Sequence, residues 1–222
     1  GLFWRADFSA FYTGGALVRD GLGARLYDTD LQTRYQQHIL QGRSFKDGAL
    51  FYNYPPHAVF LFVPLALLPL STAYFVWTFI QLGLLVWLLF LLRRIAHAWE
   101  AAERRVLFIT ALALPSLLSN FLLGAFSLWA LVCWLQFYCA LKEGHAARSG
   151  LWLVAGAVKP QNMWMPGSVL LGARRWRALV GGMLGGAAIV ILSSALLGWH
   201  TWFDFFELLQ AATGFFDAFG IN

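Results

Sequence analysis

Three short polar motifs hold the residues of this sequence that are best suited to chemistry. Asp7 lies close to Arg5 and directly precedes an aromatic run that includes Tyr12. The other two motifs are Tyr54-Pro55-Pro56-His57 and Lys159-Pro160-Gln161, and the latter interrupts an apolar stretch. A carboxylate can act as a general base when it comes within hydrogen-bond reach of a proton, and a lysine ammonium suits a phosphate as a point charge. These residues are therefore the candidates for catalysis and substrate binding.

Each motif also has a structural interpretation. Aspartate is a preferred helix N-cap, and on local sequence alone the cap is favoured for Asp7. The Tyr-Pro-Pro-His segment could form a rigid wall beside a sugar, but a loop that ends at a helix start is locally favoured. Lys159 could snorkel to a membrane interface. For this residue we favour a function, because a lysine inside a membrane is costly and Pro160 marks a break.

The composition indicates an integral membrane protein. Of the 222 residues, 59% are hydrophobic and 12% are charged, whereas a soluble domain has about 25% charged residues. The net charge is +5, but Lys and Arg form short clusters between apolar runs, which indicates membrane topology and no nucleic-acid partner. Cys133 and Cys139 are six residues apart on different helix faces, so neither a disulfide between them nor a metal site is expected.

The polar residues 5–56 must position Asp7, and we expect them to form a loop that bears short interfacial helices. Phe8, Phe11 and Tyr12 have helical spacing, which predicts a helix over residues 7–17 that Gly21 and Gly23 terminate. A second helix is predicted to start with Asp28 or Thr29 as its cap and to run to about residue 40.

The remaining sequence alternates apolar runs with basic clusters. Residues 72–92, with Ser71 as cap, and residues 178–197 are long enough to span a membrane. The shorter runs, at 57–69, 106–118, 128–141, 150–158 and 163–171, are either tilted helices with misjudged ends or broken helices that line a cavity. Asn120 and Gly124 are expected in a loop. The basic clusters should face the cytoplasm.

These patterns predict an all-α, polytopic membrane helical bundle with three segments. Residues 1–56 would form an extracytoplasmic loop, residues 57–199 a transmembrane bundle, and residues 200–222 an aromatic interfacial segment in which His200 and Asp204 form a solvated pair.

Three segments resemble a known family: DFSAFYTGGALVRDGLGARLYD, YNYPPHAVFLFVPLALLPLSTAYFVWTF and GLWLVAGAVKPQNMWMPGSVLLGARRWRAL. They are similar to the polyprenol-phosphate-mannose-dependent mannosyltransferases of glycosyltransferase family 87, in the GT-C superfamily, over about residues 5–180. The resemblance implies a GT-C fold in the cell membrane, with Asp7 as general base in the first extracytoplasmic loop. The donor would be a polyprenyl-phosphate sugar, so no nucleotide or other cofactor is implied.

In the implied reaction, an acceptor hydroxyl of a lipid or glycan attacks the anomeric carbon with inversion, and polyprenyl phosphate leaves. Lys159 or Arg5 would stabilise the leaving phosphate, while Tyr12, Tyr54, His57 and Gln161 would contact substrates. The sequence departs from the family where Gly124-Ala125 replaces a Gly-Gln pair. The helix expected before Asp7 and later family segments are missing, so we expect a fragment of a longer protein.

Two other functions are compatible with the sequence. A transporter or flippase would use broken helices and Lys159 to bind an anionic lipid-linked substrate without chemical change. A non-catalytic scaffold would bind no donor. Only the glycosyltransferase hypothesis predicts that Asp7→Asn abolishes sugar transfer in a folded protein.

Overall fold

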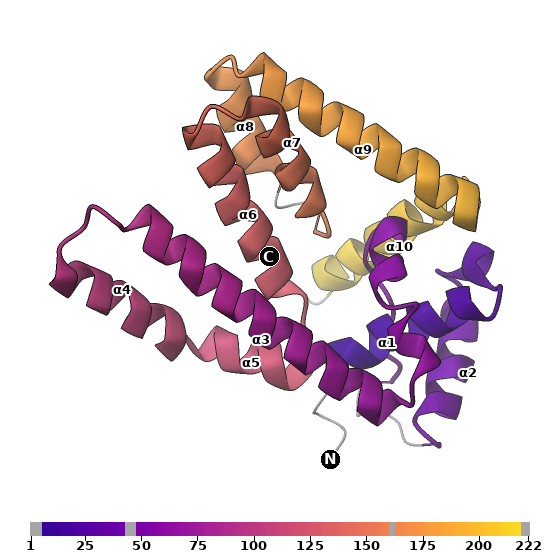
Figure 1. Ribbon diagram of the computed structural model, residues 1–222. Coiled ribbons are helices and arrows are strands. Elements are labelled where there is room, and N and C mark those ends of the chain that lie inside the picture. The colour runs from indigo at the N-terminus through magenta and orange to yellow at the C-terminus, as the bar shows by residue number, and fades with distance from the viewer. Residues whose placement is uncertain (1–5, 43–47, 160–162, 219–222) are drawn as a thin grey trace. The chain divides into compact units, whose positions relative to one another are not determined.

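The computed structural model describes residues 6–42, 48–159 and 163–218, and these residues form helices and loops but no strand. The α-helices are α1 (Ala6–Arg19), α2 (Thr29–Ile39), α3 (Leu70–Ile95), α4 (Ala101–Ala113), α5 (Pro115–Leu123), α6 (Ser127–Lys142), α7 (Ala146–Ala155), α8 (Trp164–Gly172), α9 (Trp176–Leu197) and α10 (Thr201–Ala218) (Figure 1). Short 3₁₀ helices are η1 (Gly23–Arg25), η2 (Pro56–Leu61) and η3 (Leu65–Leu67).

Within this described part of the chain, three helical stretches are long and apolar enough to cross a membrane. They are α3, α9, and the consecutive helices α4 and α5 taken together as Ala101–Leu123. The predicted spans at 72–92 and 178–197 thus correspond to α3 and α9, and the predicted all-α membrane helical bundle is confirmed. Helix α3 starts before the predicted cap Ser71, because the backbone N–H of Ala73 already donates to the Pro69 carbonyl at 2.9 Å.

Contacts divide the chain into two compact units. The first unit comprises Gly1–Ala73 and Ile189–Asn222, and the second unit comprises Tyr74–Ala188. Each is described below by itself.

Helix α1 is the centre of the first unit. Its residues 8–17 are all buried, and it packs against α2, η2 and η3. The Phe11 and Phe62 rings stack at 4.7 Å between centroids. Gly15 allows this close approach, since a Cβ there would lie 2.6 Å from the Phe62 carbonyl oxygen. The predicted helix over residues 7–17 is confirmed, and it is enclosed by its neighbours within this unit.

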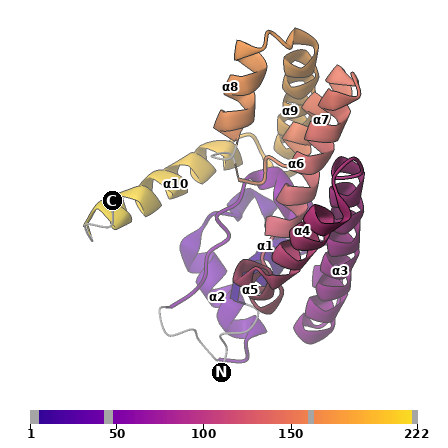
Figure 2. The same cartoon turned by 90° about the vertical axis from the view of Figure 1, so that its left-hand side faces the viewer.

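Helix α2 lies beside α1 and has the predicted start (Figures 1 and 2). The Asp28 side chain caps the helix by accepting a hydrogen bond from the Leu31 N–H at 2.9 Å. Gly21, with φ of +76°, reverses the chain between the two helices. Two buried glutamines then join α2 to the following loop, since Gln32 accepts from the Tyr52 N–H at 2.6 Å and Gln36 from the Leu50 N–H at 2.8 Å.

The second unit is built by leucine packing and close helix contacts. Leu84, Leu88 and Leu91 of α3 form a buried cluster with Leu128 and Val132 of α6. Helices α6 and α7 lie side by side (Figures 1 and 2). Small residues bring α7 and α9 together as well: a Cβ at Gly181 would lie 2.5 Å from the Ala147 carbonyl oxygen. Such residues let helix backbones approach closely in membranes.

The prediction that Asn120 lies in a loop is wrong. Asn120 is a buried residue of α5, and its amide donates to the Gln81 Oε1 of α3. The helix ends instead at Gly124, which adopts the left-handed conformation at φ of +71° that glycine tolerates best. The shorter runs at 150–158 and 163–171 correspond to the separate helices α7 and α8, as predicted.

Candidate functional site

Asp7 and Tyr54 interact electrostatically in the first unit. Asp7 is in the first turn of α1 and is partly buried. Burial raises the pKa of the Tyr54 phenol, and the nearby negative charge of Asp7 raises it further. A carboxylate in the first helical turn is also favoured by the helix dipole. The structure therefore lets the negative charge of Asp7 act on the neutral phenol of Tyr54.

The Tyr-Pro-Pro segment is held rigidly against α1. The Tyr54 ring packs edge-on against Phe11 with centroids 4.8 Å apart. Its carbonyl accepts a hydrogen bond from the Tyr27 hydroxyl at 2.6 Å, and the Pro55 carbonyl accepts one from the Tyr52 hydroxyl at 3.0 Å. Two prolines and two phenol contacts thus fix the segment that carries Tyr54 and His57.

His57 is a neutral imidazole with an unused polar atom. Burial lowers its pKa to about 4, and its ring stacks on Trp202 of α10 with centroids 6.0 Å apart. The Nδ1 atom is buried and has no hydrogen-bond partner in the described part of the chain. Because buried polar groups are normally paired, this atom is a candidate contact for a substrate hydroxyl.

The other residues predicted for the site differ in their burial and in their place in the structure. Tyr12 is buried, and its hydroxyl donates to the Leu68 carbonyl at 2.6 Å. Lys159 follows α7 in the second unit and is partly buried. The geometry that Lys159 forms with Asp7 therefore stays a prediction. Arg5 and Gln161 lie outside the described residues.

His200 is exposed, as predicted, and its pairing with Asp204 stays a prediction. Its Nε2 donates to the Ala24 carbonyl at 2.9 Å, which ties the start of α10 to η1. Among the described residues, no group of three or more His, Cys, Asp or Glu side chains could hold a metal ion.

Sequence reasoning missed a polar pocket between α1 and α2 of the first unit. It has a volume of about 540 Å³ and includes Tyr12, Arg19 and Tyr35 in its wall. A signal was present, because lining residues recur at three- and four-residue spacing in both helices. The candidates selected from the sequence were instead polar residues next to aromatic residues, prolines or apolar runs.

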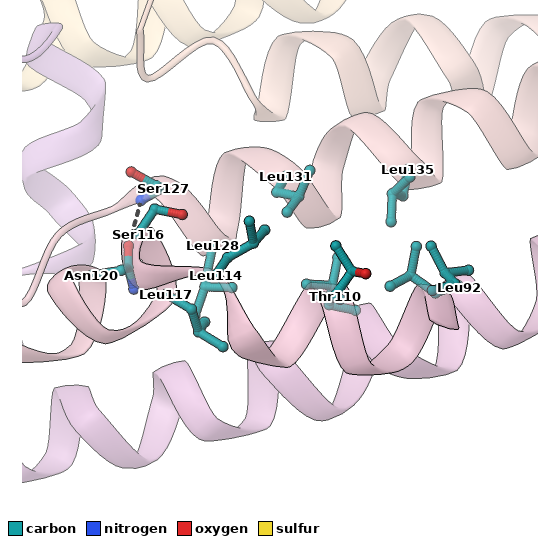
Figure 3. Close-up of a pocket in the computed structure, with 13 residues that line it drawn as sticks. Leu92, Thr110, Leu114, Ser116, Leu117, Asn120, Ser127, Leu128, Leu131 and Leu135 are labelled. Carbon is teal, nitrogen blue, oxygen red and sulfur yellow. Dashed lines mark hydrogen bonds between the residues drawn. The ribbon is translucent and has the colours of Figure 1, made fainter. Parts of the chain in front are cut away.

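The second unit contains an apolar pocket of about 350 Å³ among α3, α4, α5 and α6. Leucines line most of it, including Leu92, Leu131 and Leu135, while Asn120 and Ser127 lie at one end (Figure 3). There the Asn120 Oδ1 accepts a hydrogen bond from the Ser127 N–H at 3.2 Å. Its mostly leucine lining suits an apolar chain.

The fold defines a class, an all-α membrane helical bundle. A sequence model of glycosyltransferase family 87 matches residues 51–220, and the chain belongs to that family. The matched range includes Tyr54, His57, Lys159 and Gln161, whereas Arg5, Asp7 and Tyr12 precede it.

A curated relative adds detail to this assignment. The polyprenol-phosphate-mannose-dependent alpha-(1-2)-phosphatidylinositol pentamannoside mannosyltransferase of Mycolicibacterium smegmatis (strain ATCC 700084 / mc(2)155) is 32% identical over 172 residues. The alignment covers 76% of this chain but only 38% of the length of that relative. No solved structure matches the chain.

Proposed function

We propose that this chain is part of an integral membrane glycosyltransferase that moves a sugar, mannose, from a polyprenyl-phosphate donor to a hydroxyl of a lipid or glycan acceptor. Membership of glycosyltransferase family 87 supports the class of reaction. The name of the 32% identical relative, which includes a polyprenol-phosphate-mannose donor, supports the choice of sugar and carrier. The donor sugar is already activated by its phosphate, so the proposal includes no cofactor.

The observation that carries the proposal is that the Tyr54 ring packs on Phe11 of α1, the helix whose first turn holds Asp7, and that the charge of Asp7 acts on the Tyr54 phenol. In the proposed reaction, Asp7 takes the proton of the acceptor hydroxyl. The acceptor oxygen forms a bond to the anomeric carbon, and the bond from that carbon to the phosphate oxygen breaks. The electron pair leaves with polyprenyl phosphate, and the configuration at the carbon inverts.

The remaining site residues have supporting roles in this proposal. Lys159 and Arg5 would stabilise the charge that develops on the leaving phosphate. Tyr12, Tyr54, His57 and Gln161 would contact the sugars. The neutral His57 ring, with its unpaired Nδ1, is suited to receive or orient a hydroxyl rather than to bind the phosphate.

The membrane arrangement is part of the same proposal. The enzyme would be a multi-pass protein of the cell membrane, with residues 1–56 as an extracytoplasmic loop, residues 57–199 as the bundle and residues 200–222 as an interfacial segment. The basic side chains Arg93 and Arg94 at the end of α3 would then lie on the cytoplasmic side.

Transfer of labelled mannose from polyprenyl-phosphate-mannose to membrane lipids tests the proposal. The full-length protein is compared with Asp7→Asn, and with Asp30→Asn as a matched control, because Asp30 is an exposed acid in the first turn of α2. We expect Asp7→Asn to lose at least about 100-fold in rate, the scale of a general base, with the melting temperature retained. Equal rates in all three proteins would remove Asp7 from the mechanism. Movement of the donor across the membrane without product would support a transporter.

A further inference from the structure

A basic pocket lies within the second unit, where α3 ends and α4 begins. Figure 1 shows the turn that joins these two helices. The pocket has a volume of about 790 Å³, which is within the range of small-molecule sites. Its wall combines three basic and three apolar side chains: Arg93, His97 and Arg104, and Leu89, Phe90 and Phe108. Because the described lining includes no Asp or Glu, an anionic ligand is favoured.

Arg93 is the basic side chain of this pocket that is available to a ligand. It is exposed, and no ion pair joins it to another residue in the described part of the chain. Its neighbour Arg94, which is not in the wall of the pocket, is paired with Glu143 at 2.5 Å. Of these two adjacent arginines at the end of α3, one is therefore neutralised by the protein, and the other brings its charge to the pocket.

Arg104 is held in place by the turn between the helices. Its Nη1 donates to the Trp99 carbonyl at 2.7 Å and to the His97 carbonyl at 3.3 Å. Since one nitrogen makes both bonds, Nε and Nη2 can donate to a ligand, and the planar guanidinium suits a phosphate. An arginine that is already oriented loses less side-chain entropy when a ligand binds.

The acids closest in sequence contribute to a different pocket. Glu100 and Glu103 are in the wall of a separate pocket, together with Trp99 and Val106. The Glu103 Oε2 also accepts a hydrogen bond from the Glu100 N–H at 3.0 Å, which engages this carboxylate at the start of α4. The acidic and basic side chains around the turn are thus segregated into two pockets.

The apolar side chains of the basic pocket lie further into the candidate spans than its arginines. On α3, Leu89 and Phe90 come four and three residues before Arg93, and on α4 Phe108 comes four residues after Arg104. Such spacing places the side chains on one helix face, about 5 to 6 Å apart along the axis. Both helices belong to stretches that are long and apolar enough to cross a membrane, so their charged ends are expected at the level of lipid headgroups. The pocket is therefore polar at that level and apolar towards the hydrocarbon, as a phospholipid is.

We propose that this basic pocket binds an anionic diacyl phospholipid of the bilayer as a resident lipid that takes no part in a reaction. The phosphodiester would accept hydrogen bonds from Arg93 and Arg104, and the acyl chains would pack on Phe90 and Phe108. Basic pockets between membrane helices bind lipid headgroups in this way. A free phosphate ion could use the arginines but would leave the aromatic wall uncovered, so a lipid is the favoured source of the anion. The inference does not rest on the proposed sugar transfer.

Binding of phosphatidylglycerol to the full-length protein in neutral detergent tests the charged part of the pocket. Phosphatidylcholine with the same acyl chains is the second probe. The variants are Arg93→Gln and, as a matched control, Arg105→Gln, because Arg105 is exposed but is not in the wall of the pocket. Loss of a charge-assisted hydrogen bond should weaken phosphatidylglycerol binding about tenfold or more in Arg93→Gln, and phosphatidylcholine should bind the unchanged protein about tenfold more weakly. Arg105→Gln should change binding by less than about twofold, since an exposed charge outside the site is screened.

A second pair of variants tests the apolar wall. Phe90→Ala removes a ring of the pocket that is 61% exposed, and Phe79→Ala removes a ring of the same helix that is 72% exposed and lies outside the pocket. Both variants should fold, because neither ring is buried. Phe90→Ala should weaken phosphatidylglycerol binding about fivefold through lost apolar contact, while Phe79→Ala should leave it unchanged.

The remaining outcomes contradict the proposal. Equal weakening in Arg93→Gln and Arg105→Gln would mean only a general attraction of lipids to surface charge, and unchanged binding in Arg93→Gln would remove the pocket from lipid binding. Equal binding of the two lipids would exclude recognition of the negative charge. An equal loss in Phe90→Ala and Phe79→Ala would exclude a specific apolar wall.

Competition distinguishes the possible sources of the anion. Inorganic phosphate should not displace phosphatidylglycerol at equal concentration, and displacement would assign the pocket to a free anion. Tighter binding of polyprenyl phosphate than of phosphatidylglycerol would assign it to the sugar donor. Binding is measured without donor sugar or acceptor, so the lipid site can be confirmed while sugar transfer fails, or be rejected while transfer persists.

Discussion

The surroundings of α1 in the first unit and helices α3 and α4 in the second unit differ in how far their apolar side chains are buried. In the first unit, the aromatic side chains around α1 are enclosed, and Phe8, Tyr52 and Phe205 have no exposed surface. In the second unit, large apolar side chains such as Val86 and Ile109 are more than half exposed. Lipid tails solvate such side chains as well as a protein core does, so a membrane helix need not bury them.

The polar groups follow the same contrast. Buried glutamines of α2 in the first unit bond to loop backbone, as in water-soluble domains where buried polar groups are paired. In the second unit, small residues and leucines make many of the helix contacts, and the buried Asn120–Gln81 hydrogen bond joins α5 to α3. The comparison predicts that the first unit is sensitive to changes in packing and hydrogen bonding, while lipid-exposed positions of the second unit tolerate them.

The largest expected difference is between two glycines. Gly15→Ala places a methyl group 2.6 Å from the Phe62 carbonyl, and should destabilise the protein by about 3 kcal/mol through overpacking. Gly83→Ala is the matched control, because a Cβ there meets nothing within 4 Å, and it should be neutral or stabilising by about 0.5 kcal/mol. Thermal unfolding in detergent measures both. Similar melting temperatures for the two variants would contradict the close packing of α1 on η2.

A smaller effect is expected from a buried amide. Gln32→Ala leaves the Tyr52 N–H and the Leu26 carbonyl without their partner, which should cost about 2 kcal/mol. Gln37→Ala on the exposed side of the same helix is the control and should change stability by less than about 0.5 kcal/mol. Limited proteolysis at rising temperature compares the two. A loss as large in Gln37→Ala would contradict the specific role of the Gln32 hydrogen bonds, because alanine is itself the stronger helix former.

The partly buried His57 predicts a pH dependence. In the unfolded chain a histidine binds its proton near pH 6.5, whereas in the folded protein burial lowers the pKa of His57 to about 4. Between these values the unfolded chain binds more protons, so stability falls as the pH falls from about 6.5 to 4, by at most about 1.4 kcal/mol per pH unit. Below pH 4 both states are protonated and the loss levels off.

His57→Phe tests this dependence, because phenylalanine keeps an aromatic ring against Trp202 but cannot bind a proton. Melting temperatures are measured from pH 7 to 4. The wild-type curve should fall more steeply than that of the variant, and parallel curves would contradict the neutral, partly buried state of His57.

The smallest effect is expected at a lipid-facing position of the second unit. Ile109→Ala, on a side chain that is 61% exposed, should change the unfolding free energy by less than about 0.5 kcal/mol. Leu91→Ala, at a fully buried position of the α3 cluster, is the comparison and should cost about 2 kcal/mol or more. Thermal unfolding in lipid nanodiscs measures both. A large loss in Ile109→Ala would mean that another part of the protein covers α4.

Local signals in the sequence predicted most of the helices. Asp28 marks the start of α2, and the run at 178–197 marks α9, because capping and apolar length depend on neighbouring residues. Asn120 was misplaced for the opposite reason. Its amide is paired with Gln81, which lies 39 residues away in the sequence, and no local pattern reveals a partner on another helix.

The residues of the candidate site also fall into those that local sequence identifies and those that only packing identifies. Motif composition singled out Asp7, Tyr54 and His57, but their relation depends on the packing of α1 against the segment around η2. The polar pocket escaped notice because its residues are ordinary in type and form a pocket only when the faces of α1 and α2 meet.

The sequence by itself determined that this is an all-α membrane protein and which family it resembles, because composition, apolar length and motif order are local properties of a chain. Only the tertiary structure decided which polar groups lie together. The charge of Asp7 acts on the Tyr54 phenol, the His57 Nδ1 is buried without a partner among the described residues, and Arg19 is held by Asp20 and Ala66. These relations depend on contacts between distant segments, which packing and desolvation select together.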